Sequence, residues 1–316
     1  MTTLNIVVPC YNEEAVLPET LRRLLVVLDQ LQQQDKVSAS SQIYCVDDGS
    51  SDNTWALIEQ HAALDARVCG IKLSTNRGHQ NALLAGLLSA DGDAVISIDA
   101  DLQDDIGIIE EMVDAFHDGT DVVYGVRRRR DQDTLFKRLS ARCFYRILQL
   151  MRVQIQFDHA DFRLMSRRAL EALKEYSEVN LFLRGLIPTI GFPSKVIKYD
   201  RHSRFAGESK YPFYRMLALA VDGITSFSAV PLRMIAGLGI LIFILSLLLS
   251  FWALWIRMFS VDAVPGWASS VLPTYLLGGL QLFSTGVVGE YVAKTYLETK
   301  RRPRFIIEKV LGQKDK

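Results

Sequence analysis

Acidic residues two positions apart occur three times in this chain, but only Asp99 and Asp101 directly follow a run of apolar residues, AVISI. A second acidic pair, Asp47 and Asp48, stands at the end of the apolar run IYCVD. Carboxylates gathered in one place repel one another unless a cation compensates, and ligand sets made only of oxygen suit Mg²⁺ or Mn²⁺. The pattern therefore predicts a divalent cation site, with a solvated acidic loop as the alternative.

The elements that must position these acids are strands. Up to about residue 200, five apolar runs alternate with amphipathic stretches: NIVVP, IYCVD, VCGIKL, AVISI and VVYGV. This alternation predicts a mostly parallel α/β sheet with helices on both faces, whose ligands bind at the carboxyl ends of the strands. The first run leads into PCYNEE, without the G-x-G-x-x-G of a dinucleotide-binding protein.

Charge is nearly absent between Met234 and Gly289, in a chain with a mean hydropathy of +0.13. Met234–Ile256 carries no charge over 23 residues, which is enough for a helix to cross a bilayer. Ala263–Gly289 is a second uncharged stretch, and its glycines would allow close contact between helices. We predict a two-helix transmembrane hairpin that also supports a homo-oligomer, with buried core helices as the alternative. Both a purely soluble enzyme and a mostly membrane-embedded protein are excluded.

Lys plus Arg and Asp plus Glu both number 36, but the charges are segregated along the chain. Arg127–Arg152 holds nine basic and two acidic residues beside aromatic ones, which predicts an interfacial helix on an anionic membrane or, alternatively, a solvated basic helix. Lys294–Lys316 holds eight basic and three acidic residues. Because basic flanks stay on the cytoplasmic side, we expect both termini there. No signal peptide is evident, and the four dispersed cysteines indicate a reducing compartment.

The order of several motifs resembles a known family over essentially the whole chain. These motifs are VVPCYNEE, VDDGSSDNT, NRGHQNA, DADLQD, DFRLMSR, FAGESKY and GEYVAKTYLETKRRP. They resemble family 2 glycosyltransferases and, within them, the polyprenyl-phosphate glycosyltransferases. The resemblance is closest to the bactoprenol glucosyltransferases of O-antigen modification and more distant to the dolichol-phosphate mannose synthases.

The resemblance implies a Rossmann-like GT-A domain over residues 1–200, followed by a juxtamembrane loop and interfacial helix over 201–232. Two transmembrane helices over 233–293 and a basic cytoplasmic tail over 294–316 would complete the chain. We therefore expect a multi-pass protein of the bacterial inner membrane whose catalytic domain is cytoplasmic.

The implied reaction is transfer of a hexose, glucose from UDP-glucose, to undecaprenyl phosphate with inversion at the anomeric carbon. Other donors remain open, namely a UDP-N-acetylhexosamine, a UDP-modified arabinose or GDP-mannose. A processive polysaccharide synthase is disfavoured because the chain has no Arg-Trp pair for a Q-x-x-R-W motif. A non-catalytic membrane adaptor is disfavoured by the intact acidic motif. We expect no nucleic-acid partner.

The resemblance, together with the basic stretch after residue 126 for the acceptor phosphate, indicates four groups of functional residues. The expected ligands of Mg²⁺ or Mn²⁺ are Asp99, Asp101 and Gln103. The expected nucleotide-sugar contacts are Pro9, Tyr11, Asn12, Glu13, Asp47, Asp48 and Asp99, although Tyr11 is equally suited to packing. The expected contacts to the acceptor phosphate are Arg127, Lys137, Arg138, Arg163 and Lys210, the last of which could touch the donor instead. The expected catalytic residues are Asp101 and Asp161.

Asp161, in DFRLMSR, is the residue that the resemblance implies as the base. A phosphate monoester has a second pKa of about 6, so the acceptor is already largely deprotonated near neutral pH. If Asp161 removes a proton, Asp161→Asn slows transfer less at pH 8 than at pH 6, whereas an equal loss indicates positioning. A salt bridge to Arg163 or Arg167 is the structural alternative, and Arg163 could orient the carboxylate.

Overall fold

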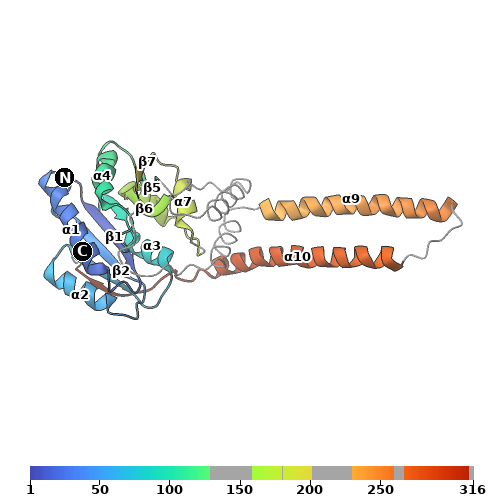
Figure 1. The fold of residues 1–316 in the computed structure, drawn as a ribbon, viewed down its shortest axis with the longest axis horizontal. Coiled ribbons are helices and arrows are strands. Elements are labelled where there is room, and N and C mark those ends of the chain that lie inside the picture. The colour runs from blue at the N-terminus through green and yellow to red at the C-terminus, as the bar shows by residue number, and fades with distance from the viewer. Residues whose placement is uncertain (129–158, 180, 201–229, 260–266, 313–316) are drawn as a thin grey trace. The chain divides into compact units, whose positions relative to one another are not determined.

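The structure, a computed structural model, describes residues 1–128, 159–179, 181–200, 230–259 and 267–312 (Figure 1). The chain divides into two compact units. The first comprises Met1–Tyr145, Gln154–Pro212 and Arg301–Lys316, and the second comprises Arg146–Val153 and Phe213–Lys300.

The first unit is built on an eight-stranded sheet in the order β7-β5-β6-β4-β1-β2-β3-β8. Its strands are β1 (Leu4–Cys10), β2 (Gln42–Asp47), β3 (Val68–Leu73), β4 (Ala94–Ser97), β5 (Val122–Arg127), β6 (His159–Ser166), β7 (Ser194–Tyr199) and β8 (Ile307–Leu311). The five apolar runs of the sequence all form strands, and the expected mostly parallel sheet is confirmed. Only β6 and β8 run antiparallel to their neighbours in the described sheet.

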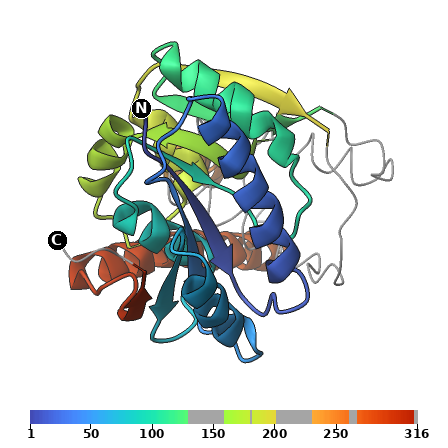
Figure 2. The same ribbon diagram turned by 90° about the vertical axis from the view of Figure 1, so that its left-hand side faces the viewer.

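Helices cover both faces of this sheet, as the sequence predicted (Figure 2). One face packs against α1 (Leu17–Gln33), α2 (Thr54–Leu64) and α4 (Ile109–His117), which follows the short 3₁₀ helix η1 (Ile106–Ile108). The other face packs against α3 (His79–Ser89), α6 (Arg167–Lys174) and α7 (Leu183–Thr189). All seven residues of β1 are buried, as expected for a central strand that is covered on both faces.

The C-terminal strand β8 lies within residues 294–316, for which the sequence predicts only a basic tail. The strand pairs antiparallel with β3 at one edge of the sheet. Two of its charged side chains form ion pairs with neighbouring elements of the same unit. Glu308 Oε1 is 3.2 Å from Lys72 Nζ, and Lys309 Nζ is 2.7 Å from Glu59 Oε1.

The second unit contains two long helices, α9 (Val230–Phe259) and α10 (Trp267–Lys300). Several of their apolar side chains are exposed, among them Leu241, Leu248 and Phe283. Within the ranges that the structure describes, no helix combines the length and the mean hydropathy of a membrane crossing. The transmembrane hairpin therefore stays a prediction.

Candidate active site

The antiparallel register of β6 against β4 brings two predicted acids together. Ser97 is the register partner of Arg163. Because the two strands run in opposite directions, Asp99, two residues after Ser97, and Asp161, two residues before Arg163, lie at the same end of the strand pair. The Ser97 hydroxyl donates to the backbone carbonyl of Asp161 and fixes this end of β6.

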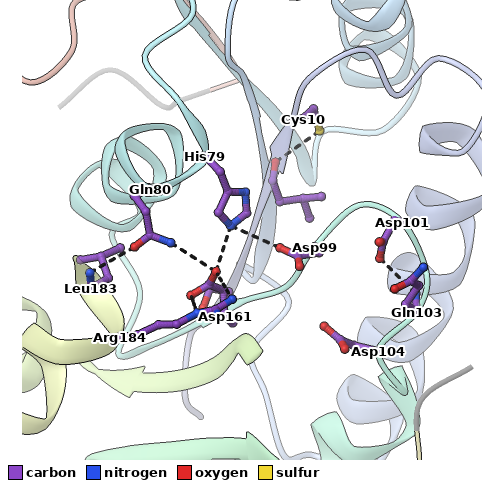
Figure 3. A network of polar contacts seen from close by, with 12 residues as sticks. Cys10, His79, Gln80, Asp99, Asp101, Gln103, Asp104, Asp161, Leu183 and Arg184 are labelled. Atoms are coloured by element: carbon purple, nitrogen blue, oxygen red, sulfur yellow. Dashed lines mark hydrogen bonds and ion pairs between the residues drawn. The ribbon is translucent and has the colours of Figure 1, made fainter. Parts of the chain in front are cut away.

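A third side chain, His79, lies between these acids at the start of α3 (Figure 3). Its Nε2 is 3.1 Å from Asp161 Oδ2 and 3.5 Å from Asp99 Oδ1. The helix begins directly after Gly78, whose φ of 86° is a left-handed conformation that glycine adopts without strain. His79, Asp99 and Asp161 each offer a ligand atom within 4.8 Å of the others, so this group could hold a metal ion.

The carboxylate of Asp161 is buried, with 3% of the side chain exposed, and is surrounded by donors. Arg163 Nη2 and Arg184 Nε donate to Oδ1, the latter at 3.2 Å. His79 Nε2, Gln80 Nε2 and Arg184 Nη2 contact Oδ2 at 3.1, 3.3 and 3.1 Å. Burial alone would raise the pKa of Asp161, but the hydrogen bond from His79 and the charges of Arg184 and Arg163 outweigh it and hold the pKa well below its usual range.

Asp99 has the opposite electrostatic character. Burial raises the pKa of Asp99 to about 6, against the effect of His79 and with the help of the nearby carboxylates of Asp161, Asp104 and Asp101. The neighbouring carboxylates thus make ionisation of Asp99 less favourable, as expected from the clustering of acidic residues in the sequence. A bound cation would relieve that repulsion.

The predicted metal ligands share one loop after β4. Gln103 is 8% exposed, and its backbone N–H donates to Asp101 Oδ1 at 3.2 Å. In Figure 3, Asp101 and Gln103 lie on the side of Asp99 away from Asp161. Among the described residues, the buried Gln103 Oε1 accepts no hydrogen bond, and Asp99 Oδ1 has the His79 Nε2 contact at 3.5 Å but accepts no hydrogen bond. Buried oxygens that are not saturated by donors suit a divalent cation, so these residues fit the ion that the sequence predicts.

The loops after β1 and β2 hold most of the predicted nucleotide-sugar residues. Pro9 is buried within β1, whereas Tyr11 is 50% exposed. Asn12 and Glu13 join this loop to the one after β2: Asn12 Oδ1 accepts from the N–H of Ser51 at 2.8 Å, and the N–H of Glu13 donates to a threonine hydroxyl at 2.9 Å. The exposed Tyr11 side chain is therefore accessible to a ligand.

Asp47 and Asp48 are both buried, and burial raises the pKa of each. The two oxygens of Asp48 accept from the backbone N–H groups of Arg77 at 2.7 Å and Gly78 at 2.9 Å. Asp47 Oδ1 accepts from the N–H of Ser50 at 3.3 Å. In this structure Asp48 holds the loop that leads to His79, in addition to any role with the nucleotide.

The predicted acceptor-phosphate residues fall into three situations. Arg127, at the end of β5, is partly exposed and is held by Asp104 Oδ1 at 3.2 Å and by the Tyr199 hydroxyl at 3.3 Å. Arg163 is fully buried behind Asp161, so its guanidinium has no access to a ligand. The remaining three candidates, Lys137, Arg138 and Lys210, lie outside the described residues.

Sequence reasoning did not include Gln80 or Arg184 among the functional residues. Gln80 belongs to the motif NRGHQNA, and the resemblance that rests on this motif is the available signal. Its Oε1 accepts from the N–H of Leu183 at 3.1 Å, which ties the start of α3 to the start of α7. Arg184 follows on α7, and no spacing in the sequence marks it.

The sequence of the chain is similar to those of known glycosyltransferases. Residues 5–174 match the model of glycosyl transferase family 2. The chain is 48% identical to an uncharacterized glycosyltransferase, YkoT, of Bacillus subtilis, over 96% of this chain and 91% of that protein. It is 35% identical to a prophage bactoprenol glucosyl transferase homolog of Escherichia coli, over 97% and 99% of the two chains. It is 36% identical to an SfII prophage-derived bactoprenol glucosyl transferase of Shigella flexneri, over 97% of both.

Matches of this identity and coverage show that the chain belongs to glycosyl transferase family 2, in the group of the bactoprenol glucosyl transferases. The resemblance read from the motifs is therefore confirmed.

Proposed function

We propose that the protein transfers glucose from UDP-glucose to undecaprenyl phosphate, giving a polyprenyl-phosphate-linked sugar for modification of a cell-envelope glycan or O-antigen. The observation that carries the proposal is the similarity over nearly the full chain to proteins named bactoprenol glucosyl transferases, at 35 to 36% identity. The acidic cluster at the ends of β4 and β6 supports it, because departure of a nucleoside diphosphate needs compensation of negative charge.

The reaction is a single displacement. An oxygen of the acceptor phosphate attacks the anomeric carbon, the bond from that carbon to the donor's diphosphate breaks, and its electron pair leaves with UDP. One displacement inverts the anomeric configuration, so an α-linked donor gives a β-linked product. A bound Mg²⁺ or Mn²⁺ supplies neutralisation of the diphosphate charge.

The residues that would hold the cation are Asp99, Asp101 and Gln103. Two of them, Asp99 and Gln103, each carry a buried oxygen that accepts no hydrogen bond from the described residues. Arg127 would bind the acceptor phosphate, and Asp104 and Tyr199 hold its guanidinium in one orientation through the contacts given above. A guanidinium fixed in this way loses less conformational entropy when a phosphate binds.

The acceptor's polyprenyl chain stays in lipid, so the protein must work at a membrane. We propose that Met234–Ile256 and Ala263–Gly289 cross the bacterial inner membrane, with the first unit and both termini in the cytoplasm. The absence of charge from both stretches and the exposed apolar side chains of α9 and α10 support this arrangement. Glycines in the second stretch support association of copies through these helices.

The test is transfer by the purified full chain in detergent micelles. Undecaprenyl phosphate, Mg²⁺ or Mn²⁺ and each of UDP-glucose, UDP-N-acetylglucosamine, a UDP-modified arabinose and GDP-mannose are supplied in parallel, and the lipid product is identified by mass and anomeric configuration. We expect a β-linked hexose from UDP-glucose, loss of activity with chelator, and loss in Asp101→Asn but not in the neighbouring Asp105→Asn. An α-linked product would contradict the single displacement. No product from any donor would favour a non-catalytic adaptor.

A further inference from the structure

The hydrogen bonds around Asp161 leave it little capacity to act as a base. An ionised carboxylate has about four acceptor sites on its two oxygens. Asp161 already receives five contacts from four side chains, two on Oδ1 and three on Oδ2. To take a proton from a substrate, Asp161 would first have to lose one of these donors. The acceptor phosphate has little need of such a base near neutral pH.

Two arginines approach this carboxylate, and they differ in access. Arg163 has no exposed side-chain surface, whereas 40% of the Arg184 side chain is exposed. Arg184 uses Nε and one N–H of Nη2 for the carboxylate, and among the described residues Nη1 makes no hydrogen bond. Of the five guanidinium donors, three remain, and two of them, one on Nη1 and one on Nη2, form the end-on edge that suits bidentate contact with a phosphate.

Arg184 lies beside other charged residues of the candidate active site. Burial alone would lower the pKa of Arg184, but the Asp161 carboxylate outweighs it, so the guanidinium stays charged. Asp99 and Arg127 also lie near enough to affect that pKa, the first by attraction and the second by repulsion. Arg184 thus lies within electrostatic range of both the predicted cation site and the predicted acceptor-phosphate residue.

We propose that Arg184 binds a phosphate oxyanion of a substrate through its free edge, and that Asp161 is a positioning residue that holds this guanidinium rather than a general base. The inference rests on the proposed function for the identity of the substrates. The phosphate belongs either to the donor diphosphate or to the acceptor monoester, and both offer the oxygens that the guanidinium requires.

The first test measures equilibrium binding to the full chain in detergent micelles, with UDP plus Mg²⁺ as one ligand and undecaprenyl phosphate as the other. Arg184→Gln removes the charge but leaves the contacts of Asp161 with Arg163, His79 and Gln80, so the variant keeps the buried pair that the fold requires. Loss of a charge-assisted hydrogen bond predicts binding about 10- to 100-fold weaker for at least one ligand. Weaker UDP binding identifies the donor diphosphate, and weaker lipid binding identifies the acceptor phosphate.

The matched control is Arg168→Gln. Arg168 likewise pairs with an aspartate, Asp121, but its side chain is 64% exposed on α6 and it belongs to none of the predicted site groups. We expect its variant to bind both ligands as the wild type does. Unchanged binding of both ligands by Arg184→Gln would overturn the proposal. Wild-type binding without glycolipid formation from any donor would instead contradict the proposed function, and the Arg184 comparison would still stand.

The second test separates positioning from proton removal by Asp161. If Asp161 positions Arg184, Asp161→Asn lowers kcat/KM by the same factor, within about twofold, at pH 5 and pH 8. The double variant Asp161→Asn/Arg184→Gln should then lose no more than the worse single variant, since both changes remove one contact. The deprotonated fraction of an acceptor with a pKa of about 6 rises about tenfold from pH 5 to pH 8. A loss about tenfold smaller at pH 8 than at pH 5, or losses that multiply, would therefore show that Asp161 acts separately from Arg184. If Asp161→Asn does not fold, the binding comparison with Arg184→Gln decides.

Discussion

Replacing Asp99 by Asn should stabilise the metal-free protein at high pH. The pKa of Asp99 rises from 3.8 to about 6 on folding, so the fold favours its neutral form. The contribution of neutral Asp99 to the free energy of unfolding is fully present below the unfolded pKa and is lost as the pH rises through about 6. The cost of ionised Asp99 is on the order of 3 kcal/mol at pH 8 and about half of that at pH 5.

Because Asn carries no charge, Asp99→Asn avoids this cost. In a chelating buffer at pH 8 we expect its melting temperature to exceed that of the wild type by roughly 6 to 12 °C, and by about half as much at pH 5. Thermal unfolding of the full chain in detergent micelles, followed by circular dichroism, measures both differences. Mn²⁺ should then raise the melting temperature of the wild type more than that of the variant, since the cation compensates the same charge.

The control for this prediction is Asp118→Asn, an exposed residue after α4, which should change stability by less than about 0.5 kcal/mol at either pH. A variant of Asp99 that is no more stable than the wild type at pH 8 would refute the reasoning. So would a stabilisation that is the same at both pH values, because it could not come from titration of Asp99.

Two further predictions concern the loops around the site. Gly49 has a φ of 67°, and a Cβ there would lie 2.6 Å from a backbone nitrogen of the facing loop, so Gly49→Ala should cost about 2 kcal/mol or more in urea unfolding. Gly119→Ala, with a φ of 91° and open space around it, should cost only about 1 kcal/mol; equal costs would contradict the steric argument. Asp104→Asn should loosen Arg127 and raise the KM for undecaprenyl phosphate about tenfold without a matching fall in kcat. Asp105→Asn, which affects only the cap of η1, serves as its control, and an unchanged KM in Asp104→Asn would argue against Arg127 as a phosphate ligand.

The sheet was largely predictable because its strands are buried on both faces. A fully covered parallel strand must be apolar along its whole length, and this leaves runs that are visible in the sequence. The strand β8 lacks this signal because it lies at an edge with most of its residues exposed. The antiparallel β6 escaped notice for another reason: its motif DFRLMSR carries buried charged residues, which the strand pattern does not anticipate.

The acids of the candidate site were predictable, but their partners were not. Asp99 and Asp101 directly follow a strand, so local order alone indicated their place at the carboxyl edge. The association of Asp161 with Arg184 depends on the register of β6 and on the position of α7, which are tertiary properties. Arg163 shows the same limit, since its motif indicated proximity to the site but could not indicate that the side chain is fully buried.

The return of the chain to β3 after α10 determines how the first unit can be produced without the long helices. A chain that stops after β7 leaves out residues 307–311, and the N–H and C=O groups of β3 on that side then lack their partners. An uncovered edge of this kind invites pairing with other molecules and precipitation. A fragment for crystallography or binding studies should therefore delete the helical segment internally and join the two remaining parts by a flexible linker.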